Sequence, residues 1–159
     1  MDSKAKLYLK RARTEIYLAT LLLKISNNKI LNDFDIPEEE TFYSGVISHR
    51  YYSIFYSAKA MLLTKNIDPE APEVHKKTVD AFKKNFIDNG ILDMKLLLIY
   101  KKMIIKAESL LEIFKEEKKK RGNFTYNTIA QANLDPANES LEHAKTFFKH
   151  CSAYILEEK

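Results

Sequence analysis

The sequence contains few of the residues that build tight turns, disulfides or phosphate-binding loops. Three glycines in 159 residues are too few for a glycine-rich phosphate loop, a collagen-like repeat or a β-sandwich with many tight turns. A single cysteine, Cys151, excludes a disulfide framework and leaves no second thiol for a zinc cluster. Arginine is also scarce, so the formal net charge of +4 comes mostly from lysine. The arginines are Arg11, Arg13, Arg50 and Arg121.

Long hydrophobic runs are missing as well. The apolar stretches 21–23 and 96–99 fall far short of the roughly 20 residues that a membrane-spanning helix needs. The N-terminal segment alternates lysines and arginines with apolar residues, which is not the pattern of a secretory signal. We therefore expect a reduced, cytoplasmic protein with no membrane span. Its mildly basic charge permits an RNA or an acidic protein as partner but does not require one.

Hydrophobic residues recur every three or four positions through most of the chain, which is the period of the α-helix. The first helix is expected to bury one stripe of residues, namely Leu9, Ala12, Ile16, Ala19 and Leu23. Pro37 and the three glutamates after it predict the start of a second helix over about 38–65, because proline and acids suit a first helical turn. This second helix is apolar over most of its surface, which is typical of the central helix of a bundle.

Three more helices follow the same period. One is expected over about 73–88 with a cap at Asn89-Gly90, one from Asp93 to a charged end at Arg121, and one from near Asp135-Pro136. The last helix is expected to bury Cys151 as a core residue rather than to expose it as a nucleophile. No strand signal or internal repeat is visible. The sequence therefore predicts one all-α domain over 1–159, an up-and-down bundle of four to five helices.

Histidines are the first candidates for chemistry, because no metal-binding or nucleophile motif is present and no metal or cofactor is expected. His49 lies on the second helix with Tyr56 on its own face, as either a histidine at the rim of the bundle or a group that contacts substrate. His75 begins the third helix beside Lys76 and Lys77. It is either an exposed terminal residue or part of a basic binding spot.

Arg121 is the second candidate. A planar guanidinium at a helix end can hold a phosphate or carboxylate with two hydrogen bonds, which lysine cannot do. Tyr126, five residues later, offers a hydroxyl or a ring to the same ligand. The alternative is an arginine that caps a helix and a tyrosine that packs beside it.

Residues 48–62, with the sequence SHRYYSIFYSAKAML, are the longest of four segments that carry a family resemblance. They resemble the central helix of the HEPN family (higher eukaryotes and prokaryotes nucleotide-binding). The others are the sequence EVHK at 73–76, Arg121 with its tyrosine five residues later, and a closing helix of the type Ala144-x-x-Phe147-Phe148. The resemblance covers roughly residues 5–156. It implies a bundle of four or five helices that commonly dimerises, with paired polar motifs facing one cleft.

The resemblance also implies what the site should contain. Many members of the family are ribonucleases in which a histidine follows the arginine after four to six residues. Here positions 126–128 are Tyr, Asn and Thr, so that histidine is absent. A tyrosine with a pKa of about 10 is a poor proton acceptor near neutral pH. The chain instead resembles a branch of the family in which an arginine is followed by an Ala-Asp-Tyr-type tripeptide. In this chain the arginine is Arg121 and the tripeptide is Phe124-Thr125-Tyr126. That branch is often found beside a minimal nucleotidyltransferase, as one half of a toxin–antitoxin pair.

Three functions follow as hypotheses. The first is a non-catalytic, dimeric HEPN-like module of a toxin–antitoxin-like or defence system, which binds a nucleotide, RNA or a nucleotidyltransferase partner. Its expected ligand-binding residues are Arg121, Tyr126, Tyr52, Tyr56 and Arg50. The second is a metal-independent ribonuclease in which Arg121 acts with His49 or His75 as the catalytic residues. The third is a structural adaptor that uses exposed aromatic residues to bind protein partners.

Overall fold

The structure is a computed structural model that describes residues 3–27, 34–37, 39–119 and 134–157. Side chains are described throughout these ranges except at 106, 109–119 and 134–136. The helices are α1 (Ser3–Asn27), α2 (Tyr43–Thr64), α3 (Val74–Phe82), α4 (Met94–Lys119) and α5 (Leu134–Glu157), with a π-helical turn (Lys83–Ile87) directly after α3. No strand occurs in these ranges, and the predicted all-α bundle is confirmed.

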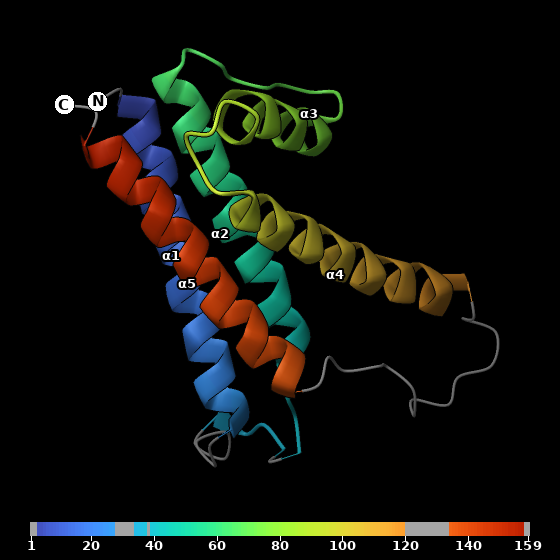
Figure 1. Cartoon of the computed structure of the whole chain (residues 1–159). Coiled ribbons are helices and arrows are strands. Elements are labelled where there is room, and N and C mark those ends of the chain that lie inside the picture. Colours follow the sequence, from blue (N-terminus) through green and yellow to red (C-terminus); the bar gives the residue numbers. More distant parts are fainter. Residues whose placement is uncertain (1–2, 28–33, 38, 120–133, 158–159) are drawn as a thin grey trace.

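Three long helices, α1, α2 and α5, lie alongside one another and form the body of the bundle (Figure 1). The short helix α3 packs near the C-terminal end of α2, and α4 crosses α2 and extends away from the other long helices (Figure 1). Within the described ranges, no helix has both the length and the apolar character needed to cross a bilayer.

Helix α2 is the centre of the bundle, as the sequence predicts. It contacts α1, α3, α4 and α5, and its buried side chains lie on nearly every side of it. The large core cluster joins α2 residues such as Ile54 and Met61 to Phe82, Tyr100 and Phe147 from three other helices. Because these side chains are almost completely removed from water, burial of apolar surface at this centre is the main source of stability.

The predicted stripe on α1 is largely confirmed. Four of its residues, Ala12, Ile16, Ala19 and Leu23, are buried, and Leu9 is partly buried against the core. Cys151 is fully buried on α5, so its expected role as a core residue is also confirmed.

The predicted start of the second helix near Pro37 is wrong, because α2 begins at Tyr43. The backbone N–H of Phe42 donates a hydrogen bond of 2.8 Å to Oγ of Ser26, and the hydroxyl of Tyr43 donates one of 2.7 Å to Oδ1 of Asn27. These bonds attach the start of α2 to the end of α1. The tertiary contact therefore decides where the helix begins, and the acidic signal after Pro37 is overridden.

The third helix also differs from its prediction over 73–88. Its α-helical part ends at Phe82 and the chain continues as a π-helical turn. Within this turn the side-chain Nδ2 of Asn85 donates a hydrogen bond of 2.8 Å to the carbonyl of Ala81. Gly90 adopts a φ of 68°, the left-handed conformation predicted for the cap at Asn89-Gly90. The wider π-helical turn places both Phe86 and Ile87 in the core.

Candidate functional site

A groove of about 510 Å³ opens where α2, α3 and α4 meet. Its lining combines aromatic rings, cations, carboxylates and a few apolar side chains. The lining residues are Tyr51, Tyr52, His75, Lys76, Val79, Asp80, Lys101, Ile104, Ala107 and Glu108. This size and mixture are typical of a site for a small organic ligand rather than for a bare ion.

Aromatic rings form one wall of the groove. The hydroxyl of Tyr51 and Nδ1 of His75 are 2.6 Å apart, which is hydrogen-bonding distance. The His75 ring lies 4.3 Å from the Phe55 ring and 6.3 Å from the Tyr52 ring, measured between centroids. Tyr52 has 38% of its surface exposed, so a ligand in the groove can reach its ring.

Burial sets the protonation state of this wall. It lowers the pKa of His75, and the nearby Lys59 ammonium lowers that pKa further. Burial also raises the pKa of the Tyr51 hydroxyl, with smaller contributions from Tyr52 and Glu108. At neutral pH His75 is therefore an uncharged imidazole beside a protonated phenol, and both groups can form hydrogen bonds to a ligand.

Charges of both signs surround the rings. Lys76 and Lys101 are exposed cations at the groove, and Asp80 and Glu108 are exposed carboxylates. Lysine ammonium groups bind phosphate, and carboxylates accept hydrogen bonds from amino groups. Two cations matched by two acids favour a ligand with one phosphate and a polar ring over a highly charged polyphosphate.

The structure brings together some of the predicted site residues and separates others. Tyr52 and His75 lie in the groove, whereas Tyr56 does not line it and stacks instead on Tyr8 and Tyr52. His49 faces α1, where its Nδ1 donates a hydrogen bond of 2.6 Å to Oε2 of Glu15. The two candidate histidines therefore lie in different environments, and only His75 belongs to the groove.

Arg50 is fully buried and does not line the groove. Its Nε, Nη1 and Nη2 atoms, like Oγ of Ser53 one turn later, have no hydrogen-bond partner among the described residues. Burial lowers the pKa of Arg50 to about 9, and Glu142 opposes this shift. The predicted site residues Arg121 and Tyr126 lie outside the described residues.

Sequence reasoning missed the contribution of α4 to the groove. Lys101, Ile104 and Glu108 are spaced by three and four residues, so they share one face of α4. The sequence shows that two charged residues, Lys101 and Glu108, lie two helical turns apart on that face. Nothing in the sequence, however, indicates that this face lies opposite His75.

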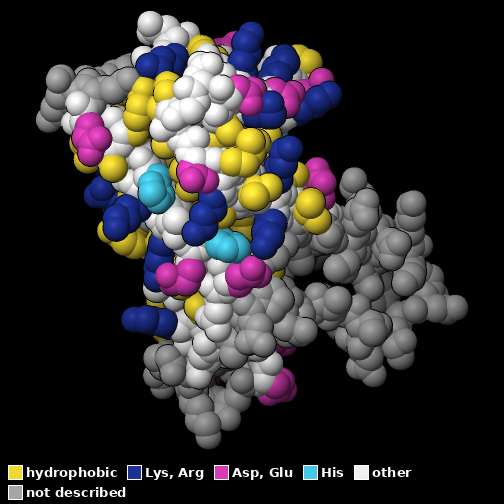
Figure 2. Space-filling view, viewed as in Figure 1, with side chains coloured by type: hydrophobic (Ala, Val, Ile, Leu, Met, Phe, Trp, Pro, Cys, Tyr) yellow, Lys and Arg dark blue, Asp and Glu magenta, His cyan; other side chains and the backbone are white. Residues whose placement is uncertain are grey.

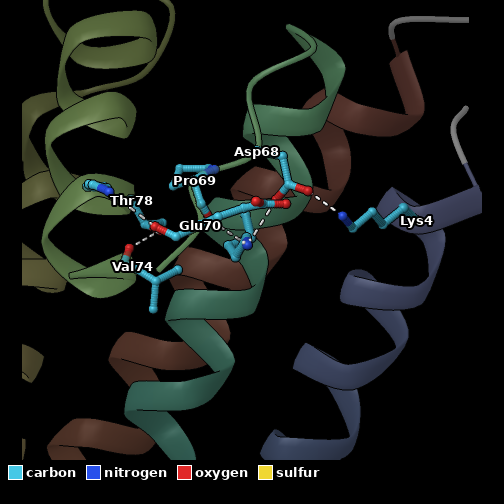
Figure 3. A network of polar contacts seen from close by, with 8 residues as sticks. Lys4, Asp68, Pro69, Glu70, Val74 and Thr78 are labelled. Carbon is cyan, nitrogen blue, oxygen red and sulfur yellow. Dashed lines mark hydrogen bonds and ion pairs between the residues drawn. The ribbon is translucent and has the colours of Figure 1, made fainter. Parts of the chain in front are cut away.

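A polar network holds the segment that leads into α3 (Figure 3). Nζ of Lys59, on α2, lies 2.9 Å from Oδ1 of Asp68 and donates a hydrogen bond of 2.8 Å to the carbonyl of Pro69. Lys4 of α1 also pairs with Asp68. Because this segment immediately precedes α3, the network fixes the position from which His75 reaches the groove.

Charges of both signs lie on the face of the molecule shown in Figure 2. On the face shown in Figure 2, Lys and Arg side chains alternate with Asp and Glu, and hydrophobic patches lie between them. A general attraction for polyanions does not explain a site on such a surface.

Comparison with known proteins gives three relatives of partial coverage, and no family model matches the chain. The chain is 35% identical to "Putative toxin MJ0605" of Methanocaldococcus jannaschii over 72 residues, which is 45% of this chain and 48% of that protein. It is 44% identical to "Putative toxin MJ0142" of the same organism over 55 residues, 35% of each chain. It is 31% identical to "UPF0332 protein PH1297" of Pyrococcus horikoshii over 80 residues, 50% of this chain and 45% of that protein. Each match spans about half or less of the relative's length.

Proposed function

We propose that this chain is a HEPN-like helical module of a toxin–antitoxin-like system and that it binds a nucleotide or RNA in the groove between α2, α3 and α4. Two of the three relatives are named as toxins, although each match covers less than half of the relative. The resemblance of residues 48–62 to the central HEPN helix supports the same proposal, because this segment supplies Tyr51 and Tyr52 to the groove.

The observation that carries the proposal is the chemistry of the groove. A nucleobase can stack on the exposed ring of Tyr52 and use its amino groups as donors to Asp80 or Glu108. Lys76 and Lys101 can hold a phosphate attached to that base. One nucleotide therefore matches each kind of group that the groove presents.

We assign the chain a binding role rather than a catalytic one, because positions 126–128 contain no histidine. Arg121 and Tyr126 remain predicted contacts to the phosphate. Their part in the proposal depends on the family resemblance and on the chemistry of a guanidinium beside a phenol.

The same proposal includes two protein partners. We expect the chain to bind a second copy of itself and a small nucleotidyltransferase. Large apolar side chains exposed on α1 and α4 support an interface of some kind. They are Leu7, Leu18, Leu21, Met94, Leu98 and Ile105. Size-exclusion chromatography with light scattering tests the dimer, and co-expression with a minimal nucleotidyltransferase encoded beside the gene tests the second partner.

The nucleotide-binding part is tested by titrating the purified protein with AMP and with the RNA hexamer rA6. Lys101→Gln removes a groove cation and should weaken binding of both ligands by roughly tenfold, because a charge-assisted hydrogen bond is lost. Lys102→Gln is the matched control, since Lys102 is an exposed neighbour that does not line the groove. Absence of binding, or equal losses in the two variants, would refute the proposed site.

The toxin part has a separate test. Induced expression of the chain in a bacterial host should slow growth, and Lys101→Gln should relieve the effect while Lys102→Gln does not. Unchanged growth at confirmed levels of folded protein would count against a toxin role and would leave the binding result unaffected.

One observation favours a metal-independent endoribonuclease as the second candidate. His75 is a neutral imidazole inside the groove at pH 7, whereas His49 is engaged with Glu15 on another side of α2. In the tautomer in which Nδ1–H donates to the oxygen of Tyr51, Nε2 of the neutral imidazole can accept the proton of an RNA 2′-hydroxyl. Cleavage of RNA in EDTA that is lost in His75→Ala and retained in His49→Ala would establish this activity. Cleavage that survives in His75→Ala would exclude the assignment of His75 as base.

A further inference from the structure

A row of stacked tyrosines runs from the groove across α2 to α1. Tyr52, which lines the groove, stacks on Tyr56 with centroids 6.1 Å apart and ring planes inclined by 27°. Tyr56 stacks on Tyr8 of α1 at 5.9 Å and 16°. The rings therefore form a continuous aromatic row that begins at the proposed nucleotide site and leads away from it.

The guanidinium of Arg11 lies over the middle ring of the row. Cζ of Arg11 lies 4.7 Å from the centroid of the Tyr56 ring, and the Arg11 side chain is exposed. The acid one turn further along α1, Glu15, is hydrogen-bonded to His49. No ion pair of Arg11 occurs within the described part of the chain. The guanidinium thus lies over a ring while its side chain is exposed, and no hydrogen bond or ion pair engages it among the described residues.

Packing of α1 on α2 explains why Tyr8 and Tyr56 touch, but it does not require the exposed members of the row. Tyr52 is 38% exposed, and a solvent-facing arginine over Tyr56 contributes little to a core. Aromatic rings and guanidinium planes that follow one another beside exposed cations are the arrangement on which unpaired bases stack.

We propose that the exposed Tyr52 ring and the exposed Arg11 guanidinium, held next to each other by Tyr56 between them, form a stacking surface for single-stranded RNA that continues out of the groove. The inference rests on the proposed function, because the groove would hold one nucleotide and the row would hold the unpaired bases next to it. A duplex does not fit this arrangement, since its bases are already stacked on each other and their faces are not available to tyrosine.

The experiment compares the affinities of AMP and rA6 in variants of the row, with circular dichroism and melting temperature as folding controls. Arg11→Gln and Tyr56→Leu should weaken rA6 binding by roughly tenfold and leave AMP binding unchanged. Tyr56→Phe keeps the ring and should retain rA6 binding. Arg13→Gln is the matched control: Arg13 is also on α1 and also lies over a ring, that of Phe148 at 5.7 Å, but it is not part of the row.

The outcomes separate this inference from the proposed function. If rA6 binds no more tightly than AMP, or if Arg11→Gln and Arg13→Gln lose affinity equally, the stacking surface is overturned while the groove stands. If neither AMP nor rA6 binds, both proposals fail.

A hexamer with 2-aminopurine in place of one adenine adds a direct readout, because its fluorescence should be quenched on binding to the wild type and less so on binding to Tyr56→Leu. A dA6 arm shows whether the 2′-hydroxyl contributes.

Discussion

The hydroxyl of Tyr51 lies 2.6 Å from Nδ1 of His75, and this contact connects the central helix α2 to the first turn of α3. Lys59 of α2 makes a second connection. It holds Asp68 and the carbonyl of Pro69, which lie in the segment that leads into α3. The aromatic wall of the groove is therefore fixed by two polar connections. The shape of the site depends on both.

The first prediction concerns the connection through Asp68. Asp68→Asn leaves the Lys59 ammonium, which is 6% exposed, without its counter-charge. An uncompensated buried charge should lower the free energy of unfolding by about 3 kcal/mol. Urea unfolding at pH 7 measures this change. Asp88→Asn is the control, because the Lys83–Asp88 pair is far more exposed and should contribute less than about 1 kcal/mol.

Lowering the pH should destabilise the protein as Asp68→Asn does, because protonation also removes the charge of the Asp68 carboxylate. The Lys4 and Lys59 ammonium groups hold the pKa of Asp68 below its ordinary value of 3.8. The stabilisation is therefore complete above pH 3.8 and is lost as pH falls through the lower native-state pKa. Unfolding curves of the wild type and Asp68→Asn should converge in that range. A constant gap down to pH 2 would contradict the assignment.

A second prediction follows from the lowered pKa of His75. Because burial and Lys59 disfavour its protonation, the unfolded chain binds this proton first as pH falls below 6.5. Between about pH 7.5 and 6.5 and below, the free energy of unfolding of the wild type should fall as the pH is lowered. His75→Gln should show a smaller fall over the same interval. His150→Gln, which changes an exposed histidine on α5, is the control for the substitution itself.

A third prediction uses Cys151 as a reporter of opening. Its thiol is fully buried, and burial raises its pKa well above the ordinary value. A thiol reagent should therefore label the native protein at least about a hundredfold more slowly than the urea-unfolded chain, because labelling requires α5 to open. Cys151→Ala with Lys149→Cys places a thiol at an exposed position of the same helix and should react at once. Equal rates at the two positions would show that α5 is not packed as described.

Hydrophobic period predicted the helices and most of the core but not the positions that tertiary contacts decide. Ala12, Ile16 and Cys151 were predicted to face inward because one face of a helix repeats every three to four residues. The start of α2 could not be predicted, since it is set by a hydrogen bond from Phe42 to Ser26 on another helix. For the same reason Tyr52 and His75 were identified individually, whereas their meeting with Lys101 across the groove required the packing of α4.

Arg50 gives the fourth prediction. Its guanidinium is fully buried without a hydrogen-bond partner in the described part of the chain, and its pKa is lowered to about 9. Near neutral pH it is therefore a buried cation whose desolvation is only partly offset, by the charge of Glu142. Arg50→Met keeps a long, unbranched side chain without the charge and should raise the free energy of unfolding by about 2 kcal/mol.

The control for this prediction is Arg13→Met, at an exposed position, where a change of less than about 0.5 kcal/mol is expected. The pH dependence gives an independent check. Because the native pKa lies below the ordinary value of an arginine, the wild type should gain stability as the pH rises above about 9, and Arg50→Met should lack that gain. If Arg50→Met is instead destabilised, the guanidinium makes a net favourable contribution to the folded state. The expectation that Arg50 binds a ligand would then become the better account of why an arginine occupies this buried position.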